Sequence, residues 1–401
     1  MAKNNRSARS AAGTGTIRKK TVTRKGSQYT YWEARYTTGY DPGTGKQIQR
    51  SITGKTQKEV AQKLKAATAA IDAGTYQAPS KMTVGEWLTT WVETYLGGVK
   101  PLTVASYTGQ IKNHIKPALG AIKREALNAH TIQGFYNELG VEKDGKPGLS
   151  PKSIKNIHGI LHKALQQAVL IGYIRSNPAD AVTLPRVTKK ELAPLDEEDS
   201  KIFLEAIKGH RFEALYTIVL FTGMREGEAL GLTWDCVDFA RGTILINKQL
   251  QRERKRNAQY ILVPTKSDKA RMIVPAPFVM QLLKRHKTKQ AAMQLKAGPA
   301  WQNSGFVFTN ELGQHLIPYT VYRNFKDIVA SIGRPDARFH DLRHSYAVAS
   351  IRAGDDIKTV QGNLGHATAA FTLDVYGHVT DQMKQASAAR MEGYIKDILN
   401  L

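Results

Sequence analysis

The sequence predicts a multidomain α+β protein: a small three-stranded sheet plus a helix, then a helical domain, then a mainly helical domain with a small β-sheet. Its 401 residues exceed what one core ordinarily organises. A hydrophobic content of 41% is typical of folded domains. Apolar residues change from alternation to helical spacing at segments rich in Gly or Pro. These changes predict domains at residues 1–75, 83–187 and 188–401, with a linker at 76–82.

The first domain begins with a basic lead rich in Gly, Ser and Ala, which we expect to be flexible. Three runs rich in β-forming residues follow, and turn residues such as Asp41-Pro42-Gly43 separate them. The runs cover residues 16–23, 29–37 and 46–52. Residues 55–73 then place apolar side chains at helical spacing. We expect three antiparallel strands packed by one helix.

The second domain carries helical periodicity throughout, and its helices begin near Thr, Asn or Ser. Thr83 is a favourable N-cap for the first helix, and Pro151 suits the first turn of the last one. Further helices are predicted at residues 102–115, 128–139 and 150–171. Pro178, Pro185 and a charged run then mark the next boundary.

The third domain alternates helical segments with short β-forming runs. The predicted strands are residues 243–249, 260–264 and 272–275. A last helix, from about Met383 to Ile398, carries an apolar stripe that needs a surface to cover. The pattern alone leaves open whether this helix docks on its own domain or elsewhere.

A formal net charge of +24 points to a polyanionic partner, and we predict nucleic acid. A membrane is the weaker alternative, because the apolar runs fall far short of the roughly 20 residues that a spanning helix needs. No signal peptide is expected, and the single cysteine, Cys236, fits a reducing cytoplasm. The alternative for each basic residue is a solvated surface. The candidate DNA contacts are Arg35, Lys46, Arg50, Lys112, Lys152 and Lys155.

Four segments of the third domain contain residue types that suit phosphoryl transfer. They are Thr222-Gly223-Met224-Arg225-Glu226-Gly227-Glu228, Pro264-Thr265-Lys266-Ser267-Asp268-Lys269, His340-Asp341-Leu342-Arg343-His344, and Leu364-Gly365-His366 with Tyr376-Gly377-His378. Each alone has an ordinary structural explanation, such as a surface ion pair or a core tyrosine. Together they supply two guanidinium groups for phosphate oxygens, histidines as bases, a lysine as acid and a tyrosine as nucleophile.

In this order and context the four segments resemble the catalytic boxes of the tyrosine recombinases, the phage-type integrase family. The chain is similar to integrases of Gram-positive conjugative transposons and temperate phages. The resemblance implies a catalytic set of Arg225, Lys266, His340, Arg343, His366 and Tyr376. The two arginines and His366 would contact the scissile phosphate, Lys266 would be the general acid, and His340 the proton acceptor. Tyr376 would form a 3′-phosphotyrosyl link and Glu228 would orient Arg225, while Lys269 is the alternative to Lys266.

The resemblance also implies the organisation of the whole reaction. Residues 1–75 would be an AP2-like arm-binding domain, 83–187 a SAM-like core-binding domain and 188–401 the catalytic domain with a C-terminal exchange helix. A homotetramer on double-stranded attachment sites would pass through a Holliday junction, with a possible accessory DNA-bending or excision factor. We expect no cofactor, because a phosphotyrosine bond conserves the energy of the broken phosphodiester.

Two other classes are weighed against this one. His340 and His344 have the spacing of a helical zinc pair, which would indicate a metal hydrolase, but Arg343 lies beside them and no third ligand is evident. A non-catalytic DNA-binding regulator would explain the charge and the first two domains. It would leave the Arg/Lys/His/Tyr set of the third domain unexplained.

Overall fold

The structure is a computed structural model of the chain, which divides into two compact units, residues 1–188 and 189–401. The residues that it describes are 16–24, 27–41, 43–73, 76, 82–143, 145–188, 194–253, 259–265, 269–366, 368 and 381–399. Within these ranges, no helix has both the length and the apolar character needed to cross a membrane.

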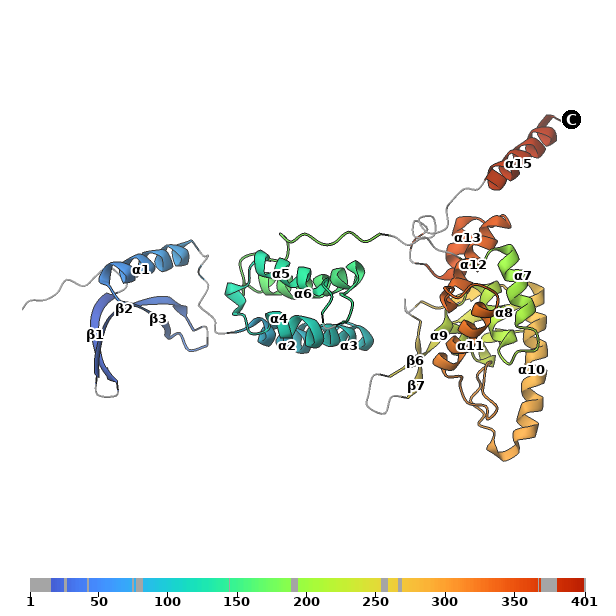
Figure 1. The fold of residues 1–401 in the computed structure, drawn as a ribbon, viewed down its shortest axis with the longest axis horizontal. Helices are drawn as coiled ribbons and strands as arrows, with labels where there is room; N and C mark the ends of the chain where they lie inside the picture. Colours follow the sequence, from blue (N-terminus) through green and yellow to red (C-terminus); the bar gives the residue numbers. More distant parts are fainter. Residues whose placement is uncertain are drawn as a thin grey trace, which may run out of the picture. The chain divides into compact units, whose positions relative to one another are not determined.

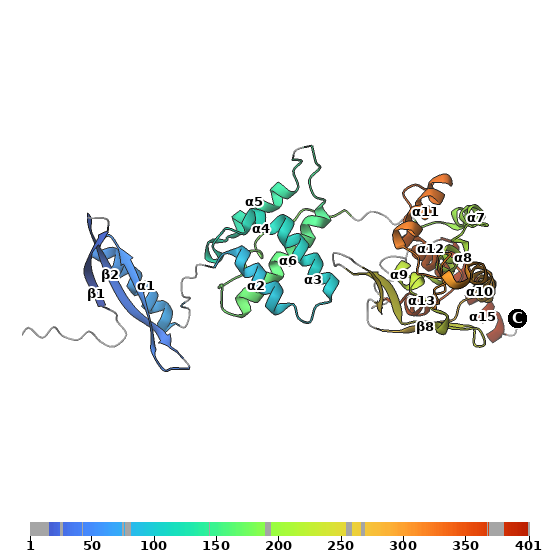
Figure 2. The ribbon, with the colours of Figure 1, turned by 90° about the horizontal axis from the view of Figure 1, so that it is seen from below.

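The first part of unit one is an antiparallel sheet in the order β1-β2-β3, with one helix lying across a face, as predicted (Figures 1 and 2). Its elements are β1 (Thr16–Arg24), β2 (Ser27–Tyr40), β3 (Gln47–Gly54) and α1 (Gln57–Asp72). Because side chains alternate along a strand, Ala34 and Tyr36 of β2 point toward α1. They are buried there with Val60 and Leu64 of the helix. Among the described residues of 16–73, no helix lies on the opposite face of the sheet.

The second part of unit one is helical; Thr83 is confirmed as an N-cap, whereas α3 begins after Lys100 without a side-chain cap. Its helices are α2 (Val84–Tyr95), α3 (Pro101–Gln110), α4 (Lys116–Leu119), α5 (Ala129–Leu139) and α6 (Pro151–Leu170). Thr83 and Glu86 cap α2 reciprocally, each side chain accepting from the other's backbone N–H at 3.2 and 2.8 Å. The segment predicted as one helix over 102–115 leaves α-helical geometry at Gln110. It continues through a π-helical turn, Ile111–Ile115, into α4.

Unit two is mainly helical, as predicted, with two small sheets (Figure 1). Its helices include α7 (Glu197–Ala206), α8 (Glu213–Thr222), α9 (Glu226–Leu230), α10 (Pro277–Ala297), α11 (Pro318–Ser331), α12 (Phe339–Arg352), α13 (Ile357–Leu364) and α15 (Asp381–Leu399). The apolar helix α8 packs against α12 in the core, where the ring of Tyr216 contacts Phe203, Phe325 and Phe339.

The strands of unit two correct one prediction. They are β4 (Val237–Asp238), β5 (Thr243–Ile246), β6 (Lys248–Arg252), β7 (Tyr260–Pro264) and β8 (Arg271–Ile273). The segment 243–249, predicted as one strand, divides: β5 pairs with β4 and β8, whereas β6 pairs with β7. The division accompanies close packing of α9 on β6. A Cβ at Gly231, after α9, would lie only 2.6 Å from the Leu250 nitrogen.

Candidate active site

The first catalytic segment begins where α8 ends at Gly223. Its φ of +64° is left-handed, and a Cβ there would lie 2.5 Å from the Tyr346 ring and 2.6 Å from Leu364. Glycine therefore allows the end of α8 to lie directly against α12 and α13. The Gly223 carbonyl accepts a hydrogen bond from Nη1 of Arg343 at 2.7 Å, two residues before Arg225.

Arg225 precedes the short helix α9 and is held by Glu228. Its Nη1 donates to Oε1 of Glu228 at 2.7 Å, and its backbone N–H donates to Oε2 at 3.0 Å. Burial alone would raise the pKa of Glu228, but the hydrogen bonds and charges of Arg271 and Arg225 outweigh it and lower the pKa to about 2. The Arg225 side chain keeps 24% of its surface exposed, so an anion can reach it.

Arg343 lies on α12 and is almost fully buried, with 2% of its surface exposed. Besides its bond to Gly223, it donates from Nη2 to the Leu364 carbonyl at 2.6 Å, at the end of α13. Arg225 reaches the next carbonyl, donating from Nη2 to Gly365 at 3.3 Å. The two guanidinium groups therefore meet at the same turn, although one comes from the α8–α9 connection and the other from α12.

Three histidines surround the arginines. His340 and His344 lie one turn apart on α12, with ring centroids 4.9 Å apart, and His366 follows the left-handed Gly365 that ends α13. Burial and the neighbouring Arg343 charge lower the pKa of His366 to about 4, and burial with the charge of His340 lowers that of His344 to about 4. Burial and Arg343 also lower the pKa of His340. At pH 7 the rings are therefore neutral in the DNA-free protein.

Two predicted catalytic residues, Lys266 and Tyr376, lie outside the described residues. The ends of the lysine segment are described. β7 ends at Pro264, and the Thr265 hydroxyl donates to the Lys269 carbonyl at 2.9 Å. The side chain of Lys269, the alternative acid, is exposed. The segment that contains both lysines is therefore held closed at its two ends, between β7 and β8.

Sequence reasoning missed Arg271, the first residue of β8. It donates from Nη1 and Nη2 to the two Glu228 oxygens at 3.0 and 2.6 Å, and from Nε to the Asn363 carbonyl at 2.8 Å. The signal in the sequence was a basic residue at the start of a short apolar strand. That signal names no partner, because Glu228 stands 43 residues earlier in the chain.

On the N-terminal sheet, basic side chains surround one carboxylate on the face opposite α1. Glu33 is 5% exposed and pairs with Arg18 at 2.8 Å, Lys20 at 3.6 Å and Arg35 at 3.7 Å. We call this cluster the open basic face. It includes the predicted Arg35 and adds two residues that sequence reasoning did not select.

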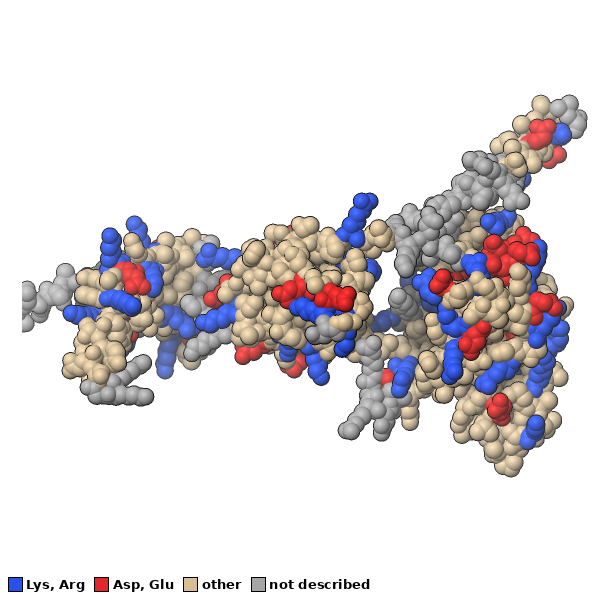
Figure 3. All heavy atoms as spheres, viewed as in Figure 1, with Lys and Arg blue, Asp and Glu red and all other residues tan. Residues whose placement is uncertain are grey.

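The other predicted DNA contacts are exposed but do not join the open basic face. Arg50 is opposite Tyr36 in the sheet, so it belongs to the face that α1 covers. Lys46 lies in the turn before β3, where its carbonyl accepts from the Asp41 N–H at 2.8 Å. The remaining three are exposed on the helical part: Lys112, Lys152 and Lys155. Figure 3 shows Lys and Arg side chains on the visible face of each part, with acidic side chains among them.

The surroundings of the His340–His344 pair on α12 do not favour a metal ion. Among the described residues, no group of three or more His, Cys, Asp or Glu side chains could hold one. The charges of Arg343, Arg225 and Arg338 also act on His340 and would repel a second cation there.

Guanidinium groups match the oxygens of a phosphodiester, and neutral histidines beside them can take or share a proton. This cationic site, on a helical domain that follows further domains in a strongly basic chain, defines an enzyme class that transfers DNA strands. Comparison with known families agrees: residues 193–383 match the phage integrase family, and residues 83–140 match the N-terminal SAM-like domain of phage integrases.

Individual proteins are similar to this chain in sequence or in fold. A XerC-like tyrosine recombinase from Caldanaerobacter subterraneus is 31% identical, over 88% of this chain and 94% of that protein. The Tn1549 transposon integrase in complex with transposon right end DNA has a TM-score of 0.66 at 23% identity, covering 78% of this chain and 100% of that one. A lambda integrase tetramer bound to a Holliday junction has a TM-score of 0.55 at 19% identity, covering 88% and 94%.

The chain therefore belongs to the phage integrase family of tyrosine recombinases. It is a site-specific recombinase of the kind that mobile elements encode, and its reaction is DNA cleavage and religation. The family and the multidomain α+β architecture expected from the sequence are both confirmed.

Proposed function

We propose that this recombinase integrates and excises a mobile element through a 3′-phosphotyrosyl intermediate on Tyr376. The observation that best supports the proposal is the convergence of Arg225, Arg343 and His366 at the Leu364–Gly365 turn. Three segments far apart in the sequence meet there and offer two cations and one neutral ring to a single phosphate.

In the proposed cleavage step, the Tyr376 oxygen forms a bond to the scissile phosphorus while the bond from phosphorus to the 5′ oxygen breaks. His340 accepts the phenolic proton, and Lys266 donates a proton to the departing 5′ oxygen. Arg225 and Arg343 stabilise the charge that grows on the non-bridging oxygens. Attack by a 5′ hydroxyl on the phosphotyrosine reverses the step and rejoins DNA, so neither ATP nor a metal is required.

We assign a separate task to each domain. Residues 1–75 would bind arm-type DNA sites through the open basic face, residues 83–187 would hold the core site, and residues 188–401 would cut it. The exposed Lys112, Lys152 and Lys155 support contact between the helical domain and phosphates. Because the substrate is chromosomal and element DNA, we place the reaction at the bacterial nucleoid in the cytoplasm.

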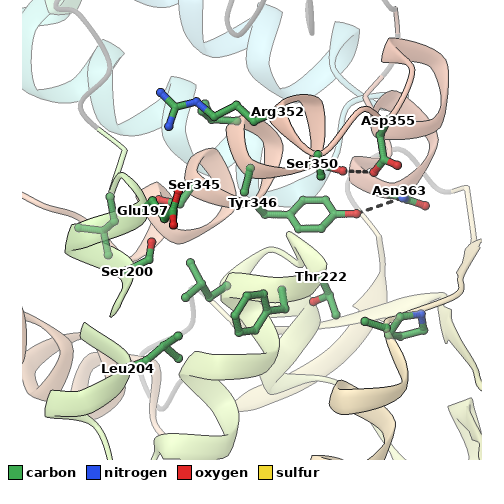
Figure 4. Close-up of a pocket in the computed structure, with 18 of the residues that line it drawn as sticks. Glu197, Ser200, Leu204, Thr222, Ser345, Tyr346, Ser350, Arg352, Asp355 and Asn363 are labelled. Carbon is green, nitrogen blue, oxygen red and sulfur yellow. Dashed lines mark hydrogen bonds between the residues drawn. The ribbon is translucent and has the colours of Figure 1, made fainter. Parts of the chain in front are cut away.

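We also propose that four copies assemble on DNA, exchanging strands through a Holliday junction. Helix α15 leaves Tyr394, Ile395 and Ile398 exposed by 62%, 41% and 59%, an apolar stripe that requires a cover. Unit two also contains a groove of about 820 Å³ between α7, α8 and α12, where Leu204 and Tyr346 line the walls (Figure 4). In our proposal the α15 helix of one copy covers this groove of the next, and an accessory DNA-bending factor aids assembly.

Removing residues 383–401 tests the assembly. The truncated protein should still bind core DNA but form fewer tetramers in sedimentation and lose ordered resolution of four-way junctions. Truncated protein that forms tetramers and resolves junctions in the normal strand order would show that α15 docks on its own domain.

Covalent trapping tests the proposed chemistry. Wild-type protein mixed with nicked attachment-site DNA should give an adduct on a denaturing gel, and Tyr376→Phe should give none while binding the DNA normally. Excess EDTA should leave the wild-type adduct unchanged. Adduct formation by Tyr376→Phe at the wild-type level would disprove the nucleophile, and loss with EDTA that zinc restores would favour a metal hydrolase.

A further inference from the structure

Arg271 connects three parts of the active site through one side chain that is 11% exposed. It belongs to β8, next to the segment 265–269 whose ends are held closed. Its guanidinium group makes a two-pronged contact with Glu228, and its Nε donates to the Asn363 carbonyl near the end of α13. Such a planar fork matches a carboxylate in a way that an ammonium group does not.

Glu228 is shared between two arginines. Its Oε1 accepts from Nη1 of Arg225 and Nη1 of Arg271, and its Oε2 accepts from the Arg225 backbone and Nη2 of Arg271. The Glu228 side chain is fully buried. Two guanidinium groups against one carboxylate leave one positive charge, whereas Arg225 and Glu228 alone would cancel. Arg271 therefore keeps the pair cationic as well as fixed in place.

The contact with α13 is equally close. A Cβ on Gly365 would lie 3.1 Å from Cδ and Nη1 of Arg271, so the left-handed glycine lets the arginine pass beside the turn. This is the turn whose carbonyls hold Arg225 and Arg343 and whose next residue is His366. Arg271 therefore joins β8 both to the arginine clamp and to the turn that precedes His366.

We propose that Arg271 is a positioning residue: through Glu228 and the α13 turn it holds Arg225 on the phosphate. This inference rests on the proposed catalytic role of Arg225. Arg271 itself does not touch DNA. Outer partners of catalytic groups typically change activity by about 10- to 100-fold, and we expect Arg271→Lys to slow cleavage within that range.

The test compares Arg271→Lys with Arg334→Lys, which weakens another guanidinium–carboxylate pair of unit two, with Asp199. Three nicked DNA substrates are used: ordinary DNA, DNA with a methylphosphonate at the scissile position, and DNA with a 5′-bridging sulfur. The methylphosphonate lacks the negative charge that Arg225 meets, and the sulfur leaves without a proton. Arg271→Lys should lose rate on ordinary DNA and recover relative to wild type on the methylphosphonate, with no such recovery on the sulfur substrate. Arg334→Lys should cleave all three at wild-type rates.

Equal losses of Arg271→Lys on all three substrates, with a melting temperature lowered no more than in Arg334→Lys, would overturn the inference, as would a wild-type rate on ordinary DNA. Tyr376→Phe in the same assay separates this result from failure of the proposed function. If that variant forms the adduct, the mechanism itself is wrong, whatever Arg271 does.

Discussion

Arginine serves two opposite purposes in this molecule. In unit two, Arg343 is 2% exposed and donates to two backbone carbonyls. On the open basic face, the side chains of Arg18 and Arg35 are 53% and 51% exposed beside Glu33. A buried and fixed guanidinium group can stabilise one charge at one place, whereas exposed ones attract a polyanion in a way that salt screens. In unit two the position of each guanidinium group determines its effect, whereas on the open basic face the total positive charge does.

The largest expected effect comes from replacing Arg225 by lysine, and the same exchange at Arg35 is its control. Arg225→Lys should slow covalent adduct formation by about 100-fold or more, because a point charge cannot keep both the Glu228 contact and the phosphate contact. Arg35→Lys should leave affinity for arm-type DNA within about twofold, since the charge is retained. Single-turnover cleavage and filter binding measure the two. Normal cleavage by Arg225→Lys would remove this residue from the phosphate.

A second prediction separates the two lysines of the segment after β7. Lys266→Ala should slow cleavage of ordinary DNA by about 100-fold or more and be largely rescued by a 5′-bridging sulfur, which needs no general acid. Lys269→Ala is the matched control and should behave like wild type on both substrates. Selective rescue of Lys269→Ala instead would exchange the two assignments.

A third prediction concerns the open basic face. Lys20→Gln with Arg35→Gln should weaken binding to arm-type DNA and make its salt dependence shallower by about one unit of slope for each lost phosphate contact. Arg18 is retained so that Glu33 keeps its closest partner. Arg50→Gln, on the face that α1 covers, is the control. If only the control lowers affinity, DNA contacts the other side of the sheet.

The smallest effect is a pH-dependent change in stability at α9. Oε1 of Glu226 is buried and has no hydrogen-bond partner, and burial raises its pKa to about 7. When folding raises the pKa of a carboxyl group, the free energy of unfolding of the protein falls as pH rises from about 4.5 through 7. Glu226→Gln should therefore raise the melting temperature at pH 8 by about 1–3 °C and leave it unchanged at pH 5.

Glu228→Gln should change the melting temperature in the opposite direction in the same measurement. Its pKa is lowered to about 2, because the bonds and charges of two arginines outweigh burial, so its charged form stabilises the protein above about pH 4.5. The variant should melt lower than wild type at pH 8. An identical response of the two variants would show that local charge at α9 does not govern their stability.

The sequence predicts the place of a site residue where local spacing along one helix sets it. It does not where the place depends on a contact with a distant segment. The three-residue spacing of His340 and Arg343 predicts that they share one face of a helix, and both lie on α12. The pairing of Arg271 with Glu228 joins a strand to a helix, and no periodicity encodes it.

The same limit applies to the β regions. Alternation along 243–249 predicts a strand, yet it does not show that the chain changes sheets between β5 and β6. In the N-terminal sheet, Arg35 and Arg50 are both predicted as DNA contacts because they are basic residues on or beside strands. The register Tyr36 to Arg50 places them on opposite faces, and register is set by contacts between strands rather than within one.

The anchor of Arg225 and Arg343 on the α13 turn also bears on which substitutions the turn can accept. Arg343 and Arg225 bind the carbonyl oxygens of Leu364 and Gly365, and a carbonyl oxygen is the same in every amino acid. The surface of α13 can therefore accumulate substitutions without altering what the arginines bind. Gly365 is the exception, since its left-handed backbone and the adjacent Arg271 leave no room for a side chain. A substitution on α13 thus leaves these carbonyl acceptors in place, whereas a side chain at Gly365 would disturb them.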